Sequence, residues 1–175
     1  MTSTGVHTFP VPKCHLMGQS GKKPSQSESR QWPQPAVSAA VFHDGRVLLA
    51  QRAKPPLAGI WSLPGGRVEP GEKARAAVER ELAEETGVKA DFKGVADVAD
   101  VILRHENGSL HAHYVITVFY GVWLSGEATP DSDCQAVEWV DISMLSERPL
   151  TQGTARIIKH AKQLLDSRNG TPKVN

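Results

Sequence analysis

Three glutamates crowd one short stretch of the chain. Glu81, Glu84 and Glu85 fall within about one helical turn, shortly after a loop that is rich in glycine. Carboxylates this close repel one another and weaken a helix that has nothing to compensate their charge. A divalent cation compensates it, and Mg²⁺ usually binds through one or two carboxylates together with the phosphates of a substrate. The spacing therefore predicts a Mg²⁺ site that acts on phosphates, and Mn²⁺ could replace Mg²⁺ there.

The simpler interpretation of such a cluster is a solvated helix face. An isolated Glu-Leu-Ala-Glu-Glu segment would be assigned to that class. The neighbouring residues favour the metal site, because the cluster belongs to a longer pattern, G-x5-E-x7-R-E-U-x-E-E-x-G-U, in which U is a bulky apolar residue. The fixed and apolar positions of this pattern are occupied by Gly66, Glu72, Arg80, Glu81, Leu82, Glu84, Glu85, Gly87 and Val88.

This pattern is the signature of the Nudix hydrolases, and the chain resembles that family with no departure inside the motif. The preceding Trp61-Ser-Leu-Pro-Gly-Gly66 is similar to the family's usual lead-in, and a looser similarity extends over residues 36–165. The resemblance implies an α/β fold, a Nudix-type α/β/α sandwich with a mixed β-sheet and a catalytic loop-helix-loop. It also implies an enzyme, a Mg²⁺-dependent diphosphatase that hydrolyses phosphorus-containing anhydrides.

Roles for the signature residues follow from the resemblance. The Mg²⁺ ligands that it implies are Glu81, Glu84, Glu85 and the backbone carbonyl of Gly66. Metal ions neutralise the charge of a diphosphate and lower the pKa of a bound water. Arg80 and Glu72 are expected to orient the carboxylates from behind. One carboxylate could instead act as the general base, and the sequence leaves this division of roles open.

Four further residues are weaker candidates for the site. Arg52, at the end of a strand, meets substrate phosphate in relatives, and a surface or structural arginine is an equal alternative. Asp131 and Asp133 follow Pro130 and could supply a loop acid that some relatives use as a base, with Asp133 the stronger candidate, although a simple polar loop is favoured for either alone. Trp61 could stack on a base, but its place in an alternating strand favours core packing.

Two histidines and two further tryptophans could be functional residues, but their sequence contexts favour structural roles. His111 and His113 point to one face of a strand, yet no third metal ligand lies nearby in the sequence. A hydrogen-bonded sheet face is therefore the favoured assignment for the pair. Trp123 and Trp139 are expected in the core.

The signature does not select the substrate, since other loops do that. The lead-in and the Arg-Glu-Leu-x-Glu-Glu-Thr-Gly run resemble the compact group described as ADP-ribose pyrophosphatases and also the branch that sanitises oxidised nucleoside triphosphates. A proline that many ADP-ribose enzymes carry past the box is replaced by Arg104, and the tyrosine of dinucleoside polyphosphate enzymes by Glu106. An ADP-ribose-like substrate is favoured, with an oxidised (deoxy)nucleoside triphosphate second. A non-catalytic nucleotide-sensing domain is the alternative of another class.

The glutamates require a helix that holds them against the glycine-rich loop. Lys73 to Thr86 contains neither proline nor glycine and is rich in helix-forming residues. Glu72 is expected at the positive end of this helix and Gly87 at its C-terminal cap. Arg80 can reach Glu72 and hold the loop onto the helix. The apolar stripe that would pack on a sheet consists of Ala74, Ala77, Val78 and Leu82.

The rest of the chain alternates strands with turns. Asp44-Gly45 and Asn107-Gly108 are hairpin turns. An amphipathic helix around residues 157–165 closes the chain. The expected strands are residues 36–42, 47–51, 60–63, 92–95, 98–104, 111–124 and 137–140.

Composition narrows the partners and the compartment. The formal net charge of +1 over 175 residues provides no large field for nucleic acid or an anionic membrane, and no apolar run approaches the about 18 residues of a membrane span. Cys14 and Cys134 show no metal-ligand spacing, which favours a cytoplasmic protein. A nucleotide-derived small molecule is the expected partner, and a homodimer would be common among relatives, with strand 111–124 serving core or interface. Residues 1–35 are expected to be a disordered tail, 36–168 the Nudix domain and 169–175 a flexible end.

Overall fold

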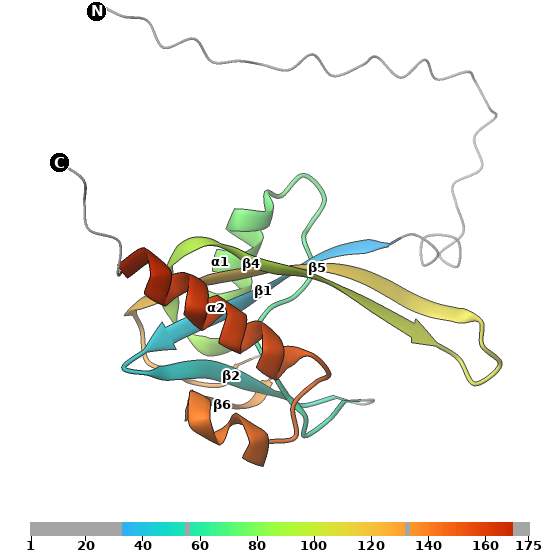
Figure 1. The fold of residues 1–175 in the computed structure, drawn as a ribbon. Helices are drawn as coiled ribbons and strands as arrows, with labels where there is room; N and C mark the ends of the chain where they lie inside the picture. The colour runs from blue at the N-terminus through green and yellow to red at the C-terminus, as the bar shows by residue number, and fades with distance from the viewer. Residues whose placement is uncertain (1–32, 55–56, 132–133, 170–175) are drawn as a thin grey trace, which may run out of the picture.

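The chain folds as three layers, a β-sheet with one long helix on each face (Figure 1). The computed structural model describes residues 33–54, 57–131 and 134–169. The expected α/β/α sandwich with a mixed sheet is confirmed. Asp133 and nearly all of the two predicted terminal segments lie outside the described residues.

The elements follow the predicted order, with three differences. One continuous strand, Lys89–Arg104, replaces the two expected strands, because β-bulges after Phe92 and Val95 absorb the break in its alternation. A 3₁₀ helix, η2, which the sequence did not predict, follows the last strand. The first strand begins two residues earlier than expected. The bounds are β1 Gln34–His43, β2 Arg46–Arg52, β3 Trp61–Ser62, α1 Ala74–Thr86, β4 Lys89–Arg104, β5 Leu110–Ser125, β6 Cys134–Asp141, η2 Ile142–Glu147 and α2 Thr154–Asn169.

The sheet leaves a gap that the glycine-rich loop fills. β1 and β2 pair only next to their turn, at Phe42 with Val47 and at His43 with Arg46, and then diverge. β3 pairs with the far end of β2, and the segment after it lies beside the first half of β1. On its other edge β1 runs parallel to β5, and β6 covers the outer edge of β2. The loop that leads into α1 is therefore a part of the sheet.

Two hydrophobic cores lie on opposite faces of the sheet. Alternate residues of β1 divide between them, since Val37, Ala39 and Val41 pack toward α1 whereas Ala40 and Phe42 pack toward α2. The expected stripe of α1 is largely confirmed, because Ala77, Val78 and Leu82 are buried and Ala74 is partly buried. The residues of α2 that face the sheet are Ile157, Ile158, Ala161, Leu164 and Leu165.

β5 belongs to the interior of the sheet. It pairs with β4 along its length and with β1 from Tyr114 onward, and its buried residues belong to both cores. The core role is therefore confirmed, and the interface role stays a prediction. Among the described helices, none is long and apolar enough to cross a membrane.

Candidate active site

Backbone hydrogen bonds tie the glycine-rich loop to β1. The Val37 N–H donates to the Gly66 carbonyl at 2.9 Å, and the Ala39 N–H donates to the Pro64 carbonyl at 2.9 Å. Because both bonds come from the central part of the sheet, the loop is held by the most rigid portion of the fold. The Gly66 carbonyl uses one of its two lone pairs in this way and retains the other.

Two glycines let the loop lie between the sheet and α1. Gly65 has φ = +153°, and a β-carbon there would come within 2.2 Å of the Val37 carbonyl oxygen. Its N–H donates to Glu85 Oε2 at 2.8 Å, which joins the loop to the helix. A β-carbon on Gly66 would lie 2.4 Å from the Glu81 carboxylate. A larger residue at Gly65 would push the loop away from β1, whereas one at Gly66 would displace the Glu81 carboxylate.

The helix ends where the sequence predicted but begins slightly later. Gly87 adopts the left-handed conformation, φ = +69°, and its N–H donates to the Ala83 carbonyl at 2.9 Å. The N-cap is Lys73, so Glu72 precedes the helix instead of occupying its first turn. Glu72 therefore lies immediately before the N-cap, next to the end of the helix where it was expected, and its carboxylate pairs with Arg80.

Arg80 is the centre of the charge network. Its Nε and Nη2 donate to the two oxygens of Glu72 at 3.0 Å each, which is the bidentate geometry of a strong arginine–carboxylate pair. Its Nη1 donates to Glu81 at 2.9 Å and to Glu84 at 3.0 Å, and Nη2 also reaches the Arg67 carbonyl at 3.1 Å. One guanidinium thus joins three carboxylates and the loop, as expected for a residue that orients them.

Arg80 and Glu72 hold each other in the charged form. Hydrogen bonding to Glu72, and less strongly to Glu81 and Glu84, raises the pKa of Arg80 above its ordinary value against the opposing effect of desolvation. The Arg80 guanidinium and the Glu69 N–H hold the pKa of Glu72 below its ordinary value. The contact between the loop and the helix is therefore insensitive to pH near neutrality.

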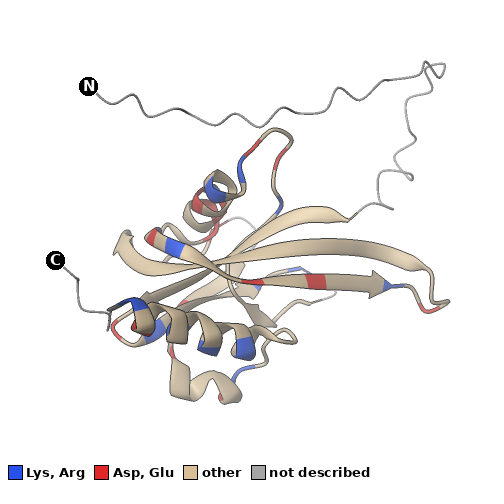
Figure 2. Cartoon of the chain, turned by 45° about the horizontal axis from the view of Figure 1, so that its top comes forward, with Lys and Arg blue, Asp and Glu red and all other residues tan. Residues whose placement is uncertain are grey.

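The carboxylates on the outer side of α1 offer oxygen donors suited to a hard cation. The Glu81 side chain is 16% exposed and that of Glu84 is 55% exposed, so the donors extend from the loop to the solvent. Figure 2 shows acidic and basic residues next to one another on this helix. Within the described ranges, no three His, Cys, Asp or Glu side chains already form a metal-binding group. Donor chemistry and the cradle at Gly66 nevertheless fit a divalent cation, since carboxylate and carbonyl oxygens are what Mg²⁺ prefers.

The weaker site candidates are only partly brought to this network. Arg52 is exposed at the end of β2, where its backbone pairs with Ile60 and Gly59. The Asp131 N–H donates to the Glu85 carbonyl at 3.2 Å, so the loop that carries Asp131 reaches the C-terminal end of α1. Asp133, the stronger candidate of the two loop acids, lies outside the described residues.

The favoured structural assignments of Trp61 and of the histidine pair are confirmed. Trp61 is 5% exposed and packs in the core on the α2 face. His113 lies 3.0 Å from Asp100 Oδ1, and His111 lies 3.3 Å from a ring nitrogen of His105. Each histidine is hydrogen-bonded on the hairpin of β4 and β5.

Three residues differ from what the sequence indicated. Trp123 and Trp139, expected in the core, are only partly buried and lie at its edge on the α1 face. Thr86, which was not singled out, is completely buried: its hydroxyl donates to the Leu82 carbonyl at 2.6 Å and accepts from the Val88 N–H at 3.2 Å. The signal available in the sequence was its position, because Thr86 is a polar residue immediately before the capping Gly87.

Comparisons with known proteins show what the chain is similar to. The family model described as the NUDIX domain matches residues 32–161. The "Putative 8-oxo-dGTP diphosphatase 2" of Mycobacterium tuberculosis is 41% identical over 113 residues, which cover 63% of this chain and 75% of that protein. The ADP-ribose pyrophosphatase of Methanocaldococcus jannaschii is 34% identical over 113 residues, which cover 65% and 64% of the two chains.

Solved structures show the same fold. The crystal structure of a MutT NUDIX hydrolase from Burkholderia pseudomallei superposes with a TM-score of 0.65 at 32% identity. The match covers 74% of this chain and 98% of that one. Almost all of the known structure is therefore covered by the superposition, whereas about a quarter of this chain lies outside it.

Proposed function

The chain belongs to the Nudix family of phosphorus-anhydride hydrolases, and we propose that it cleaves the diphosphate bond of a nucleotide with the help of a divalent cation. The observation that carries the proposal is the intact network around Arg80. Every carboxylate of the signature is present, and Arg80 and Gly65 connect them to the loop. The alternative of a non-catalytic sensor receives no support, because such domains usually lose one of these carboxylates.

The cation would be held by Glu81, Glu84 and Glu85, with the free lone pair of the Gly66 carbonyl as a further donor. Nudix hydrolases generally use divalent metal ions, and Mg²⁺ is the proposed one here. When bound, such an ion neutralises the charge of the diphosphate and lowers the pKa of a water molecule. Glu72 and Arg80 would fix the direction of the carboxylates, which is the usual role of residues behind the ligands.

The side chains of the site then carry out a hydrolysis. The oxygen of a water attacks one phosphorus, and its proton passes to a carboxylate of α1 or of the loop that contains Asp131. The bridging oxygen leaves with the other phosphoryl group, so the products are two phosphate-containing fragments. Arg52 at the end of β2 is proposed to meet the phosphates from the other side. None of the signature residues selects a particular nucleobase. We therefore assign substrate choice to the surrounding loops.

Between the two substrate classes, a (deoxy)nucleoside triphosphate is now the first candidate and ADP-ribose the second. The relative named for 8-oxo-dGTP hydrolysis is 41% identical, against 34% for the ADP-ribose pyrophosphatase. Arg104 also replaces the proline that the resemblance associates with many ADP-ribose enzymes. Both arguments point in the same direction and reverse the order that the motif alone suggested.

The substrate proposal is tested by hydrolysis of 8-oxo-dGTP, dGTP, CTP and ADP-ribose with Mg²⁺, with the products separated by chromatography. We expect a nucleoside monophosphate and pyrophosphate from a triphosphate as the fastest reaction. AMP and ribose 5-phosphate as the fastest products would assign the enzyme to ADP-ribose. Absence of any Mg²⁺-dependent product from all four compounds would contradict the proposed function.

The catalytic role of the carboxylates is tested by neutralising them one at a time. Glu84→Gln and Glu85→Gln should each lower kcat by about 100-fold or more, because each removes a charged oxygen donor while the helix remains. The matched control is Glu79→Gln, since Glu79 is an exposed glutamate of the same helix that pairs with Arg75. A rate for either variant close to that of the control would contradict the assignment of the site.

A further inference from the structure

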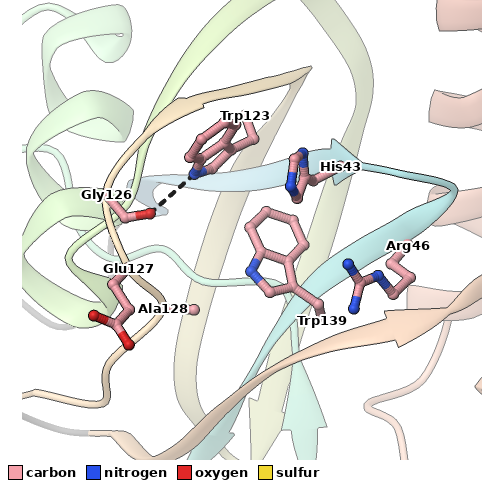
Figure 3. A pocket seen from close by; sticks show the side chains of 7 residues that line it. All are labelled: His43, Arg46, Trp123, Gly126, Glu127, Ala128 and Trp139. Atoms are coloured by element: carbon pink, nitrogen blue, oxygen red, sulfur yellow. Dashed lines mark hydrogen bonds between the residues drawn. The ribbon is translucent and has the colours of Figure 1, made fainter.

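A second hollow lies on the α1 face of the sheet, beside the turn that connects β1 and β2 (Figure 3). Its volume is about 390 Å³, which falls within the range of about 300–1,000 Å³ found for small-molecule sites. Four strands and the loop after β5 contribute to it. The side chains that line it are His43, Arg46, Trp123, Glu127, Ala128 and Trp139.

This hollow is separate from the candidate active site. His43 is six residues along β1 from Val37, whose N–H holds the Gly66 carbonyl. Six residues of a strand span about 20 Å. None of the signature carboxylates lines the hollow, and neither does Arg52. A ligand bound here would therefore leave the glycine-rich loop untouched.

The floor of the hollow is aromatic. The ring of His43 lies 4.5 Å from that of Trp123 and 5.4 Å from that of Trp139, measured between centroids. All three rings are only partly buried, so part of their surface remains open to solvent. Two partly exposed indoles that each adjoin the same histidine ring, tilted to it by 41° and 58°, offer faces on which a planar ring can stack, with a geometry-dependent gain for aromatic pairs.

The two indole N–H groups of this floor differ in whether they already have a hydrogen-bond acceptor. The Trp123 indole N–H is already bonded to the Gly126 carbonyl at 3.0 Å. No hydrogen bond from the Trp139 indole N–H is found among the described residues, and no buried side-chain nitrogen there lacks a partner, so this N–H is open to solvent. In Figure 3 it faces the side of the hollow where Glu127 and Ala128 lie. An unused donor beside open ring surface favours a ligand with acceptor atoms.

Arg46 adds a positive charge at the opposite end. Figure 3 shows Arg46 and Glu127 on either side of Trp139. Asp141, which pairs with Arg46 in the sheet, directs its carboxylate to the N–H and hydroxyl of Ser143 at 2.8 and 2.6 Å. The exposed Arg46 guanidinium makes no hydrogen bond within the described part of the chain. Its charge also helps to lower the pKa of Asp141, but its hydrogen-bond donors remain open to an anionic group of a ligand.

We infer that this hollow is an accessory binding site for a planar heteroaromatic ring that carries an anionic group, the chemistry of a nucleoside monophosphate. The base lies on the face of one of the two indoles, Trp123 or Trp139, beside the His43 ring, and the Trp139 indole N–H donates to one of its acceptor atoms. The phosphate pairs with Arg46, and Glu127 accepts from an exocyclic amine. Binding at this site needs neither the metal ligands nor turnover, so it is independent of the proposed function.

The test is a titration of the ¹⁵N-labelled protein with AMP in the presence of a chelator, followed by NMR. The chelator removes the divalent cations that would recruit the nucleotide to the active site. The chain has four tryptophans, and single Trp→Phe variants assign their indole N–H signals. We expect the Trp139 and Trp123 signals to shift and saturate with a Kd of about 1 mM or lower, while the Gly65 and Gly66 amides stay in place.

Variants and partial ligands make the test specific. Arg46→Ala should weaken binding by about fivefold or more, because it removes a charge-assisted contact to phosphate. Arg168→Ala, which removes an exposed arginine of α2, should leave the Kd unchanged. Adenosine alone and inorganic phosphate alone should each bind at least about tenfold more weakly than AMP, since each makes only part of the contacts. Arg46 is exposed, and the spectrum of each variant reports whether it is folded.

Three results would overturn the inference. The first is an absence of any shift of the Trp123 and Trp139 signals at saturating AMP. The second is equal binding by Arg46→Ala and the unchanged protein. The third is movement of the Gly65 and Gly66 amides alone, which would place the nucleotide at the active site. Failure of hydrolysis with retained binding would contradict the proposed function but not this site.

Discussion

At Gly66 there is no room for an atom larger than hydrogen between the α-carbon and the Glu81 carboxylate. The backbone there does not require the left-handed conformation, because only a clash with Glu81, 2.4 Å from the added carbon, opposes a side chain. Gly66 is therefore required for lack of space and not for a left-handed backbone conformation. A change at Gly66 disturbs the direction of one carboxylate without straining the main chain.

We predict that Gly66→Ala lowers kcat by about 10- to 100-fold, the usual effect of displacing a metal ligand's support, while the melting temperature changes little. Steady-state kinetics and thermal unfolding measure the two effects. Gly94→Ala is the matched control: this glycine of β4 also lacks a positive φ, and its added carbon would meet the Tyr120 ring at 3.1 Å. Equal kcat values for the two variants would refute the argument.

The sequence was sufficient for the charged residues of the site but not for its aromatic neighbours. Glu72 and Arg80 occupy fixed positions of a long pattern, and their contact was predicted, whereas the contacts of Arg80 with Glu81 and Glu84 were not. Trp123 and Trp139 alternate in strands as core residues do, and only the path of the loop after β5 leaves their rings at the edge of the core. Periodicity reports the face of a strand and not how completely that face is covered.

At the level of elements, α1 is tied to β4 by a buried threonine. The Thr86 hydroxyl joins the last turn of the helix to the Val88 N–H, at the point where the chain turns around Gly87 toward the sheet. Valine has nearly the same shape as threonine but offers no acceptor. A buried N–H would then remain without the partner it has in this structure.

Thr86→Val should lower the free energy of unfolding by about 1–3 kcal/mol, the cost of leaving a buried donor unsatisfied. Urea unfolding measures this loss. Thr86→Ser keeps both hydrogen bonds and gives up one methyl group, so its loss should be the smaller of the two. If the valine variant is as stable as the unchanged protein, the hydroxyl does not hold this junction.

Turn residues and alternation predicted most elements because each is a local signal. Asp44-Gly45, Asn107-Gly108 and Gly87 marked their turns and cap correctly. The bulges of β4 could not be foreseen, since they depend on the register with β5. The start of α1 differs from the expected one by a single residue, because Lys73 is the N-cap and the helix begins at Ala74.

For the molecule as a whole, acid should remove one identifiable contribution to stability. The hydroxyl and the N–H of Ser143 hold the pKa of Asp141 below its ordinary value and begin η2. A carboxylate with a lowered folded pKa stabilises the fold fully above its unfolded pKa of about 3.9. Its contribution is lost as the pH falls through the folded pKa.

We therefore expect Asp141→Asn to be less stable than the unchanged protein at pH 7, with a difference that shrinks as the pH falls below the unfolded pKa of about 3.9. Urea unfolding at a series of pH values measures the difference. In Ser143→Ala the first of the two donors is gone, so the loss on acidification should be smaller and should be complete at a higher pH. A constant difference across the series would show that the charge of Asp141 is not involved.

A chain that begins at Trp32 should retain kcat within about twofold of the full chain, because terminal segments outside the packed domain usually tolerate removal. The family match begins at this same residue. Steady-state kinetics of both proteins with the preferred substrate test the prediction. A large loss of turnover would show that residues 1–31 contribute to activity.

The parallel pairing of β1 with β5 has a consequence in time. Each residue of β1 meets a partner eighty positions later in the chain, as Gln34 does with Tyr114. Synthesis proceeds at about 5–20 residues per second, so the partner residues in β5 are made on the order of ten seconds after those in β1. Pairings this distant form slowly. During that interval the apolar strand that will carry the glycine-rich loop has an open edge, and the growing chain is then most vulnerable to aggregation.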